Sequence, residues 1–142
     1  METFTTYNES QTEAFAANFA RILKPGAVVA LFGDLGAGKT AFVRGLAAGL
    51  GYTDRVTSPT FNLVHEYDSA PKLHHYDLYR LNGVEDLEEL GYYDALDGGG
   101  ILALEWSERV EGALPPGHIR VTLVRDGTHN DKRTITIGEA AE

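Results

Sequence analysis

Hydrophobic positions along the chain follow two periods, and the alternation of these periods predicts an α/β protein. Short apolar or alternating runs, which are typical of strands, occupy residues 3–7, 27–32, 61–67, 73–79, 101–105, 119–124 and 133–137. Apolar residues at helical spacing occupy the segments from Ser10 to Pro25, from Thr40 to Gly51, and from Val84 to Leu90. Gly91 closes the last of these, and residues 92–96 are expected to continue it as another turn of helix. We therefore predict a single α/β domain over residues 1–142, with a central, largely parallel sheet, helices on both faces and antiparallel edge strands near residues 61–79 and 119–137.

A glycine-rich loop separates the predicted strand 27–32 from the helix that follows it. The loop reads Gly33-Asp34-Leu35-Gly36-Ala37-Gly38-Lys39-Thr40 and is followed by Ala41. Strand, loop and helix in this order are the context of a phosphate-binding loop, in which consecutive backbone N–H groups converge on a phosphate. Lys39 would reach the β- and γ-phosphates, and the Thr40 hydroxyl would bind Mg²⁺. The sequence thus predicts a P-loop NTPase fold that binds a nucleoside triphosphate.

Two acidic residues stand at the ends of predicted strands, where they could face the phosphates. Glu105 ends the apolar run 101–105, which has the form of a Walker B strand. Asp77 lies late in the strand 73–79. Between the loop and these strands, Thr57-Ser58-Pro59-Thr60 has three hydroxyls around a proline. This segment could sense the γ-phosphate or the metal, as switch loops do, or form an ordinary turn.

Several other polar residues have a structural explanation as well as a functional one. Ser10 begins a capping-box pattern and is expected to be the N-cap, and Thr12 could in addition contact the nucleotide. Arg133 could reach a base or a phosphate, or be a charged residue of an edge strand. His74 and His75 are adjacent in a strand and point to opposite faces, so they cannot share a metal ion. We expect these two histidines to be hydrogen-bonded or solvent-facing.

Composition narrows the range of partners. The formal net charge is −9 and the twelve Lys and Arg residues form no run, which argues against a broad electrostatic hold on DNA or RNA. Cysteine is absent, so disulfides and thiolate chemistry are excluded. No signal peptide and no membrane-spanning run is recognisable, and we expect a cytoplasmic protein without a membrane partner. An Asn-Lys-x-Asp guanine-reading motif is missing, which favours ATP over GTP.

Three classes of function are compatible with these residues. The first is an ATPase whose hydrolysis drives a partner, the second a small-molecule kinase, and the third a nucleotide-binding module that does not hydrolyse. A kinase needs an acceptor pocket and cationic groups over the transferred phosphate, and the chain has little length for such a lid. The intact set of Lys39, Thr40, Asp77 and Glu105 argues against a degenerate module. A partner-coupled ATPase is the best interpretation.

Five sequence blocks resemble the TsaE (YjeE) family of ATPases of bacterial tRNA threonylcarbamoyladenosine biosynthesis. They are GDLGAGKT at 33–40, TSPTF at 57–61, HYDLYRL at 75–81, LG at 90–91 and LEW at 104–106. Their order and spacing extend the resemblance over nearly the whole chain. The sequence departs from many relatives in having Ala41 where a second Thr is common, and Ser107 where Pro follows Glu-Trp.

The resemblance implies roles for individual residues. Thr40 and Glu105 are similar to the family's Mg²⁺ ligands, Lys39 to its phosphate-binding lysine, and Asp77 to the acid that supports hydrolysis. The implied ATP-contacting positions are Thr12, Gly33, Asp34, Leu35, Gly36, Ala37, Gly38, Lys39, Thr40, Ala41, Thr57, Ser58, Thr60 and Arg133.

The resemblance also implies partners. Family members are weak ATPases that bind a heterodimer of TsaD and TsaB, and this heterodimer transfers threonylcarbamoyl to adenosine in tRNA. ATP and Mg²⁺ would be the cofactors, and hydrolysis would drive or reset the TsaD–TsaB complex. Contact with tRNA would be only indirect.

Overall fold

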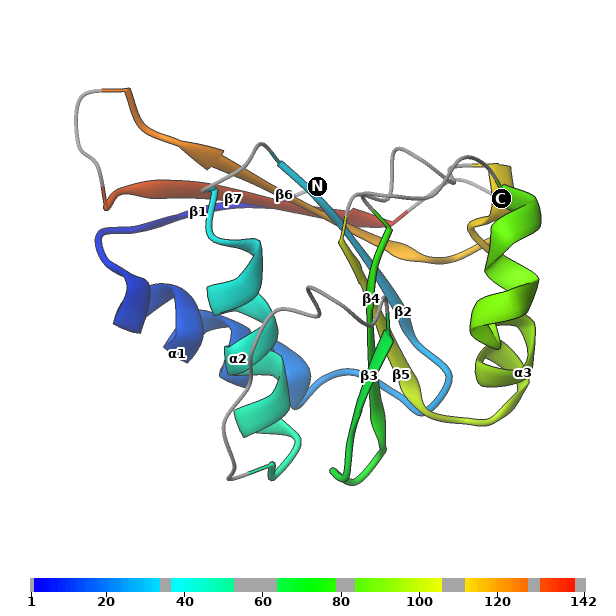
Figure 1. Cartoon of the computed structure of the whole chain (residues 1–142). Coiled ribbons are helices and arrows are strands. Elements are labelled where there is room, and N and C mark those ends of the chain that lie inside the picture. The colour runs from blue at the N-terminus through cyan, green and yellow to red at the C-terminus, as the bar shows by residue number, and fades with distance from the viewer. Residues whose placement is uncertain are drawn as a thin grey trace.

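The computed structural model describes residues 2–33, 37–52, 64–78, 84–105, 112–127 and 131–139. Within these residues, seven strands form one sheet in the order β1-β7-β6-β2-β5-β4-β3 (Figure 1). In chain order the elements are β1 (Glu2–Thr6), α1 (Glu9–Ala20), β2 (Val28–Phe32), α2 (Lys39–Gly49), β3 (Val64–Tyr67), β4 (Leu73–Asp77), the 3-10 helix η1 (Val84–Leu90), α3 (Tyr92–Asp97), β5 (Ile101–Glu105), β6 (Ile119–Arg125) and β7 (Arg133–Glu139).

The middle of the sheet is parallel and both of its sides are antiparallel. β4, β5, β2 and β6 run in one direction. β3 pairs antiparallel with β4, and β7 pairs antiparallel with both β6 and β1. The predicted α/β fold class is confirmed, including the antiparallel strands near the two positions expected for them. Because parallel strands end at one edge of a sheet, Phe32, Asp77 and Glu105 lie along the same edge.

Alternation along the strands divides the apolar side chains between two cores. Val29 and Leu31 of β2 pack with side chains of α1 and α2. Val28 of the same strand packs on the opposite face, with side chains of η1 and α3. Figure 1 shows α1 and α2 on one face of the sheet and α3 on the other. Leu73 of β4 and Ile101 of β5 belong to the first core, so every second residue after them also faces α2.

Helices α1 and α2 pack in backbone contact because α2 carries glycine where the two helices cross. A Cβ atom added at Gly45 would lie 2.6 Å from the Cβ of Ala16, and one added at Gly49 would lie 2.8 Å from that of Ala20. Arg44 of α2 forms ion pairs with Glu9 and, at 3.0 Å, with Glu13 of α1. The first helix is therefore held firmly against the helix that follows the glycine-rich loop.

The expected N-cap of α1 is wrong by two residues. Asn8, not Ser10, is the N-cap, and its side-chain Oδ1 accepts a hydrogen bond of 2.8 Å from the backbone N–H of Gln11. Gln11 in turn accepts, through Oε1, the backbone N–H of Tyr7 at 2.8 Å. Asn8 and Gln11 form the same polar-x-x-polar pattern as Ser10 and Glu13. Because β1 already ends at Thr6, the earlier pair is in a position to start the helix.

The acidic segment after β4 forms two helices that separate at Gly91, the residue expected to close the first of them. Residues Val84–Leu90 form a 3-10 helix, and a separate α-helix begins at Tyr92. Gly91 between them has a left-handed conformation, with a φ of 72°. Gly91 is the N-cap of the second helix, so the two helices are separate elements. Among the described residues, no helix is long and apolar enough to span a bilayer.

Candidate active site

The glycine-rich loop begins where β2 ends, at a position that accepts only glycine. Gly33 has a φ of 148°, and a Cβ atom there would lie 2.5 Å from the carbonyl oxygen of Leu123 in the neighbouring strand β6. At the other end of the loop, Gly38 is the N-cap of α2 with a φ of 101°. Gly33 lets the backbone pass close to β6 as it leaves the sheet, and Gly38 lets it enter α2 without a capping side chain. The N–H groups in the first turn of α2 therefore have no capping side chain and point toward the loop.

Lys39 is the first residue of α2 and is buried, with 5% of its surface exposed. Its Nζ donates a hydrogen bond of 2.6 Å to the carbonyl oxygen of Gly33, across the loop. A buried ammonium is stabilised by hydrogen bonds and by negative charge. A phosphate in the loop would supply such a charge beside Lys39, and the positive end of the α2 dipole would attract the same phosphate.

Arg133 lies against the glycine-rich loop, and Thr12 is linked to Arg133 through Thr6. A Cβ atom built at Gly38 would lie 3.5 Å from Nε of Arg133, which shows that this side chain lies against the loop. Arg133 pairs in register with Thr6, and the Thr6 hydroxyl is 2.7 Å from that of Thr12. Thr12 is 1% exposed. A nucleotide contact by either residue stays a prediction, and the Thr12 hydroxyl also donates to the carbonyl oxygen of Asn8 at 3.4 Å.

Asp77 and Glu105 lie side by side at the ends of two adjacent parallel strands. They are paired in register between β4 and β5, and the N–H of Leu78 donates to the carbonyl oxygen of Glu105 at 3.1 Å. Both residues follow, at even spacing, core residues that face α2, so both carboxylates are on the face of the sheet that carries the loop helix. Neighbouring strands are about 4.8 Å apart, which brings the two acids close together.

Glu105 is buried, at 4% exposure, and its carboxylate is in contact with a histidine that is fully buried. The histidine is His75, whose Nε2 hydrogen-bonds to Oε2 of Glu105. We did not predict this pair. Positions 75 and 77 of the sequence share one strand face, and that spacing would have suggested it if β4 and β5 had been known to be neighbours.

His74 faces the other side of the sheet, as predicted from the alternation of strand side chains. Its Nδ1 is 3.7 Å from Oε1 of Glu66. Burial lowers the pKa of His74, and the lowering by Lys72 and the raising by Glu66 are smaller effects. The two adjacent histidines therefore belong to different environments, and only His75 lies with the strand-end acids.

The residues at this edge fit a magnesium nucleotide. Thr40, in the first turn of α2, is half-buried, and Glu105 ends β5. Hydroxyl and carboxylate oxygens are hard ligands of the kind that Mg²⁺ takes together with phosphate oxygens and water. Across the described ranges, no group of three or more His, Asp or Glu side chains is placed to hold a metal by itself. A cation here would accordingly share its ligands with the phosphates, which is the usual manner of Mg²⁺.

Some predicted site residues are placed in the core and others are not described. Ala37 and Ala41 are 2% and 5% exposed, so only their backbone could contact a nucleotide. Six predicted positions lie outside the described residues, namely Asp34, Leu35, Gly36, Thr57, Ser58 and Thr60.

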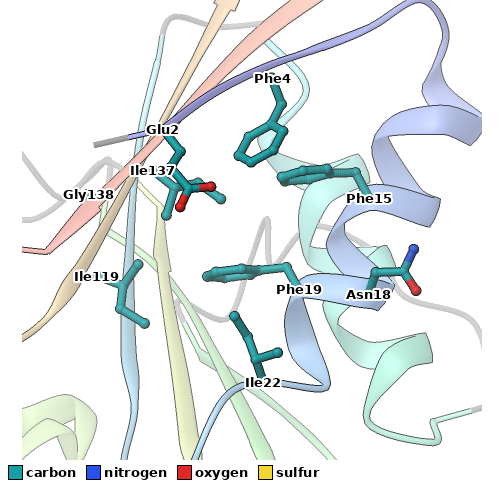
Figure 2. Close-up of a pocket in the computed structure, with 9 residues that line it drawn as sticks. All are labelled: Glu2, Phe4, Phe15, Asn18, Phe19, Ile22, Ile119, Ile137 and Gly138. Atoms are coloured by element: carbon teal, nitrogen blue, oxygen red, sulfur yellow. The ribbon is translucent and has the colours of Figure 1, made fainter.

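An apolar pocket of about 460 Å³ lies away from this edge, between α1 and the sheet. Figure 2 shows Phe15 and Phe19 directed from α1 toward the strands, with Ile119 and Ile137 opposite. Ile119 is the first residue of β6, so the pocket lies near the edge where the parallel strands begin. Its apolar lining and its position make it unsuited to a triphosphate.

A family model described as "Threonylcarbamoyl adenosine biosynthesis protein TsaE" matches residues 6–135. Two relatives bear the name tRNA threonylcarbamoyladenosine biosynthesis protein TsaE. The one from Bacillus subtilis is 42% identical over 132 residues, which is 92% of this chain and 81% of the relative. The one from Treponema pallidum is 45% identical over 119 residues, 82% of this chain and 85% of the relative.

A solved structure is similar over almost the same length. The crystal structure of Bacillus subtilis YdiB matches with a TM-score of 0.80 and 37% sequence identity, covering 99% of this chain and 86% of the YdiB chain. The matched regions include the glycine-rich loop and the strands β4 and β5 with Asp77 and Glu105.

Proposed function

This chain belongs to the TsaE family of tRNA threonylcarbamoyladenosine biosynthesis proteins, and we propose that it binds and slowly hydrolyses Mg-ATP in that pathway. One observation carries the proposal. The loop helix with its buried Lys39 and the carboxylates of Asp77 and Glu105 share one edge and one face of the sheet. A triphosphate in the loop would extend over that edge, because ligands of such sheets bind at the carboxyl ends of the strands.

Each residue has a distinct part in the proposed reaction. Lys39 leaves the Gly33 carbonyl and binds the β- and γ-phosphates, which offsets their negative charge as the terminal bond breaks. Thr40 and Glu105 would hold Mg²⁺, and the ion supplies charge neutralisation on the phosphates. Asp77 orients the attacking water or accepts its proton. An O–P bond forms to that water, the bond to the ADP oxygen breaks, and phosphate and ADP leave.

The proposed partners are a TsaD-like and a TsaB-like protein, which this chain would drive or reset by hydrolysis. The family name places the chain in tRNA threonylcarbamoyladenosine biosynthesis. A net charge of −9 makes a direct and extended contact with tRNA unfavourable. Acting on tRNA through partner proteins is consistent with that charge.

The test is single-turnover phosphate release from Mg-ATP, measured with and without purified TsaD and TsaB. We expect slow release by the protein alone and faster release with both partners. Asp77→Ala should slow hydrolysis roughly 100-fold, the usual contribution of a general base, and leave nucleotide affinity nearly unchanged. Asp94→Ala, an exposed acid of α3 on the other face, is the matched control and should keep the wild-type rate.

Three results would contradict the proposal in different ways. A wild-type hydrolysis rate in Asp77→Ala would remove Asp77 from the reaction. Transfer of the γ-phosphate to a small acceptor without partners would identify a kinase. Nucleotide binding without phosphate release under any of these conditions would identify a passive binding module.

A further inference from the structure

The hydrogen bond between His75 and Glu105 is not used by the reaction described above. His75 has no exposed surface and Glu105 has 4%. The contact joins Nε2 of the imidazole to one carboxylate oxygen, Oε2, and leaves the second oxygen, Oε1, outside the pair. Two such groups are seldom buried together in a sheet core unless they satisfy each other.

The chemistry of the pair determines which nitrogen of His75 carries the proton. An ionised carboxylate only accepts hydrogen bonds, so Nε2 must be the donor. Nδ1 is buried and, within the described part of the chain, has no hydrogen-bond partner. An N–H at Nδ1 would be a buried donor without an acceptor, which is unfavourable. His75 therefore takes the neutral tautomer with hydrogen on Nε2.

Packing keeps the imidazole in this orientation. The ring of His75 stacks on the ring of Tyr67, with centroids 6.4 Å apart and an interplanar angle of 28°. Tyr67 is itself buried and packs edge-on against Tyr52 at 5.0 Å. These ring contacts hold the imidazole in place, and its bond to Oε2 in turn restricts the side-chain torsions of Glu105.

We propose that His75 is a positioning residue that fixes the Glu105 carboxylate in the orientation in which it binds Mg²⁺. The inference rests on the proposed function, because it assumes that Glu105 serves the metal. His75 lies two residues before Asp77 on β4, and so on the same face of that strand. Its Nε2 hydrogen-bonds to Oε2 of Glu105. Metal ligands usually have an outer hydrogen-bond partner of this kind, and here the carboxylate is the ligand and the histidine is the partner.

The decisive measurement is the gain in affinity for the non-hydrolysable analogue AMP-PNP when Mg²⁺ is added, determined by calorimetry with Mg²⁺ and with EDTA. His75→Leu should reduce this gain roughly 10-fold, as loss of an outer-shell partner does, and leave the affinity in EDTA unchanged. His75→Gln, whose amide nitrogen can replace Nε2–H, should restore most of the gain. His74→Gln, on the opposite face, is the matched control and should behave as wild type.

The outcomes separate this inference from the function on which it rests. If wild type gains no affinity from Mg²⁺, the proposed function fails. If wild type gains affinity and His75→Leu gains as much, the positioning role of His75 is refuted. Equal losses with Mg²⁺ and with EDTA would show that His75 supports only the fold.

A measurement on the wild-type protein covers the case in which the leucine variant does not fold. Nitrogen-15 NMR of the imidazole distinguishes the protonated from the unprotonated ring nitrogen. We expect Nε2 of His75 to be protonated, with a signal that shifts when Mg²⁺ and AMP-PNP are added. A proton on Nδ1 instead of Nε2 would overturn the proposal, because Nε2 could then donate nothing to Glu105.

Discussion

The two ends of the parallel strands bury very different side chains. At the end where β2, β4 and β5 finish, Lys39, His75 and Glu105 are all nearly inaccessible, and each has a hydrogen-bond partner. At the end where β6 begins, aromatic and aliphatic side chains line an apolar pocket of about 460 Å³. Burying ionisable groups lowers stability unless they are paired. The first end therefore places its polar groups where the proposed site requires them, and the second end contributes to stability.

The largest effect should come from the apolar end. Phe19→Ala removes a ring that is 9% exposed and packs on Phe42 of α2 at 5.9 Å. We expect a loss of about 4 kcal/mol in the free energy of unfolding, because the removed ring leaves a cavity. Urea unfolding measures this loss. AMP-PNP affinity, measured below the unfolding transition, should stay unchanged, and a parallel fall in affinity would break the separation of the two ends.

At the polar end, the loss of one buried side chain should affect nucleotide binding. If the proposed function holds, Lys39→Ala removes charge-assisted hydrogen bonds to phosphate worth about 3 kcal/mol, which corresponds to roughly 100-fold in affinity. Stability should change little, since a buried ammonium is lost together with its bond to Gly33. Calorimetry with AMP-PNP and a thermal melt test the two parts. Lys24→Ala, an exposed lysine outside the site, should have neither effect.

Two buried tyrosine hydroxyls lie outside both ends. Tyr76 and Tyr92 pack on the α3 face, and their hydroxyls donate to the carbonyl oxygens of Leu90 and Ala113. Burial raises the pKa of each phenol from 10.0 to about 12. In the unfolded chain these phenols lose their protons first, so stability is retained below pH 10 and falls as the pH rises toward 12.

The size of this pH effect is measurable by urea unfolding. At a pH midway between the two pKa values, each tyrosine should reduce the free energy of unfolding by about 1 kcal/mol. Tyr92→Phe should remove the contribution of Tyr92 to this fall in the free energy of unfolding with pH. An unchanged stability across that range would mean that these hydroxyls are not held neutral by burial.

The smallest effect should come from the rim of the apolar pocket. Ile22 lines the pocket but is 73% exposed. Ile22→Gln should change the free energy of unfolding by less than about 0.5 kcal/mol, as exposed substitutions usually do. A larger loss in the same urea assay would show that the pocket rim is packed in solution.

The fold was largely predictable because its determinants are local in the sequence. Apolar runs of strand length indicated β2 and β5, and the pattern from Gly33 to Thr40 located the turn between β2 and α2. The N-cap of α1 was misplaced because two overlapping pairs satisfy the same pattern, and only the end of β1 at Thr6 decides between them.

Site residues were predictable only where a local sequence motif identifies them. Lys39 and Glu105 could be proposed from their own motifs. The partnership of His75 with Glu105 could not, because it depends on β4 and β5 being neighbours in a given register, and no local pattern determines that pairing. Arg133 presents the same difficulty, since β7 reaches the loop only through its place in the sheet. The segment Thr57 to Thr60 stays a prediction.

The glycine contact between α1 and α2 has a practical consequence for dissecting this protein. Gly45 and Gly49 expose helix backbone that α1 covers, and Arg44 would lose its partners Glu9 and Glu13 with that helix. A shortened chain that starts at β2 would still encode the whole nucleotide-binding motif. It would nevertheless lack the surface against which the lysine-bearing helix is seated, so the motif is not a module that can be excised or transplanted alone.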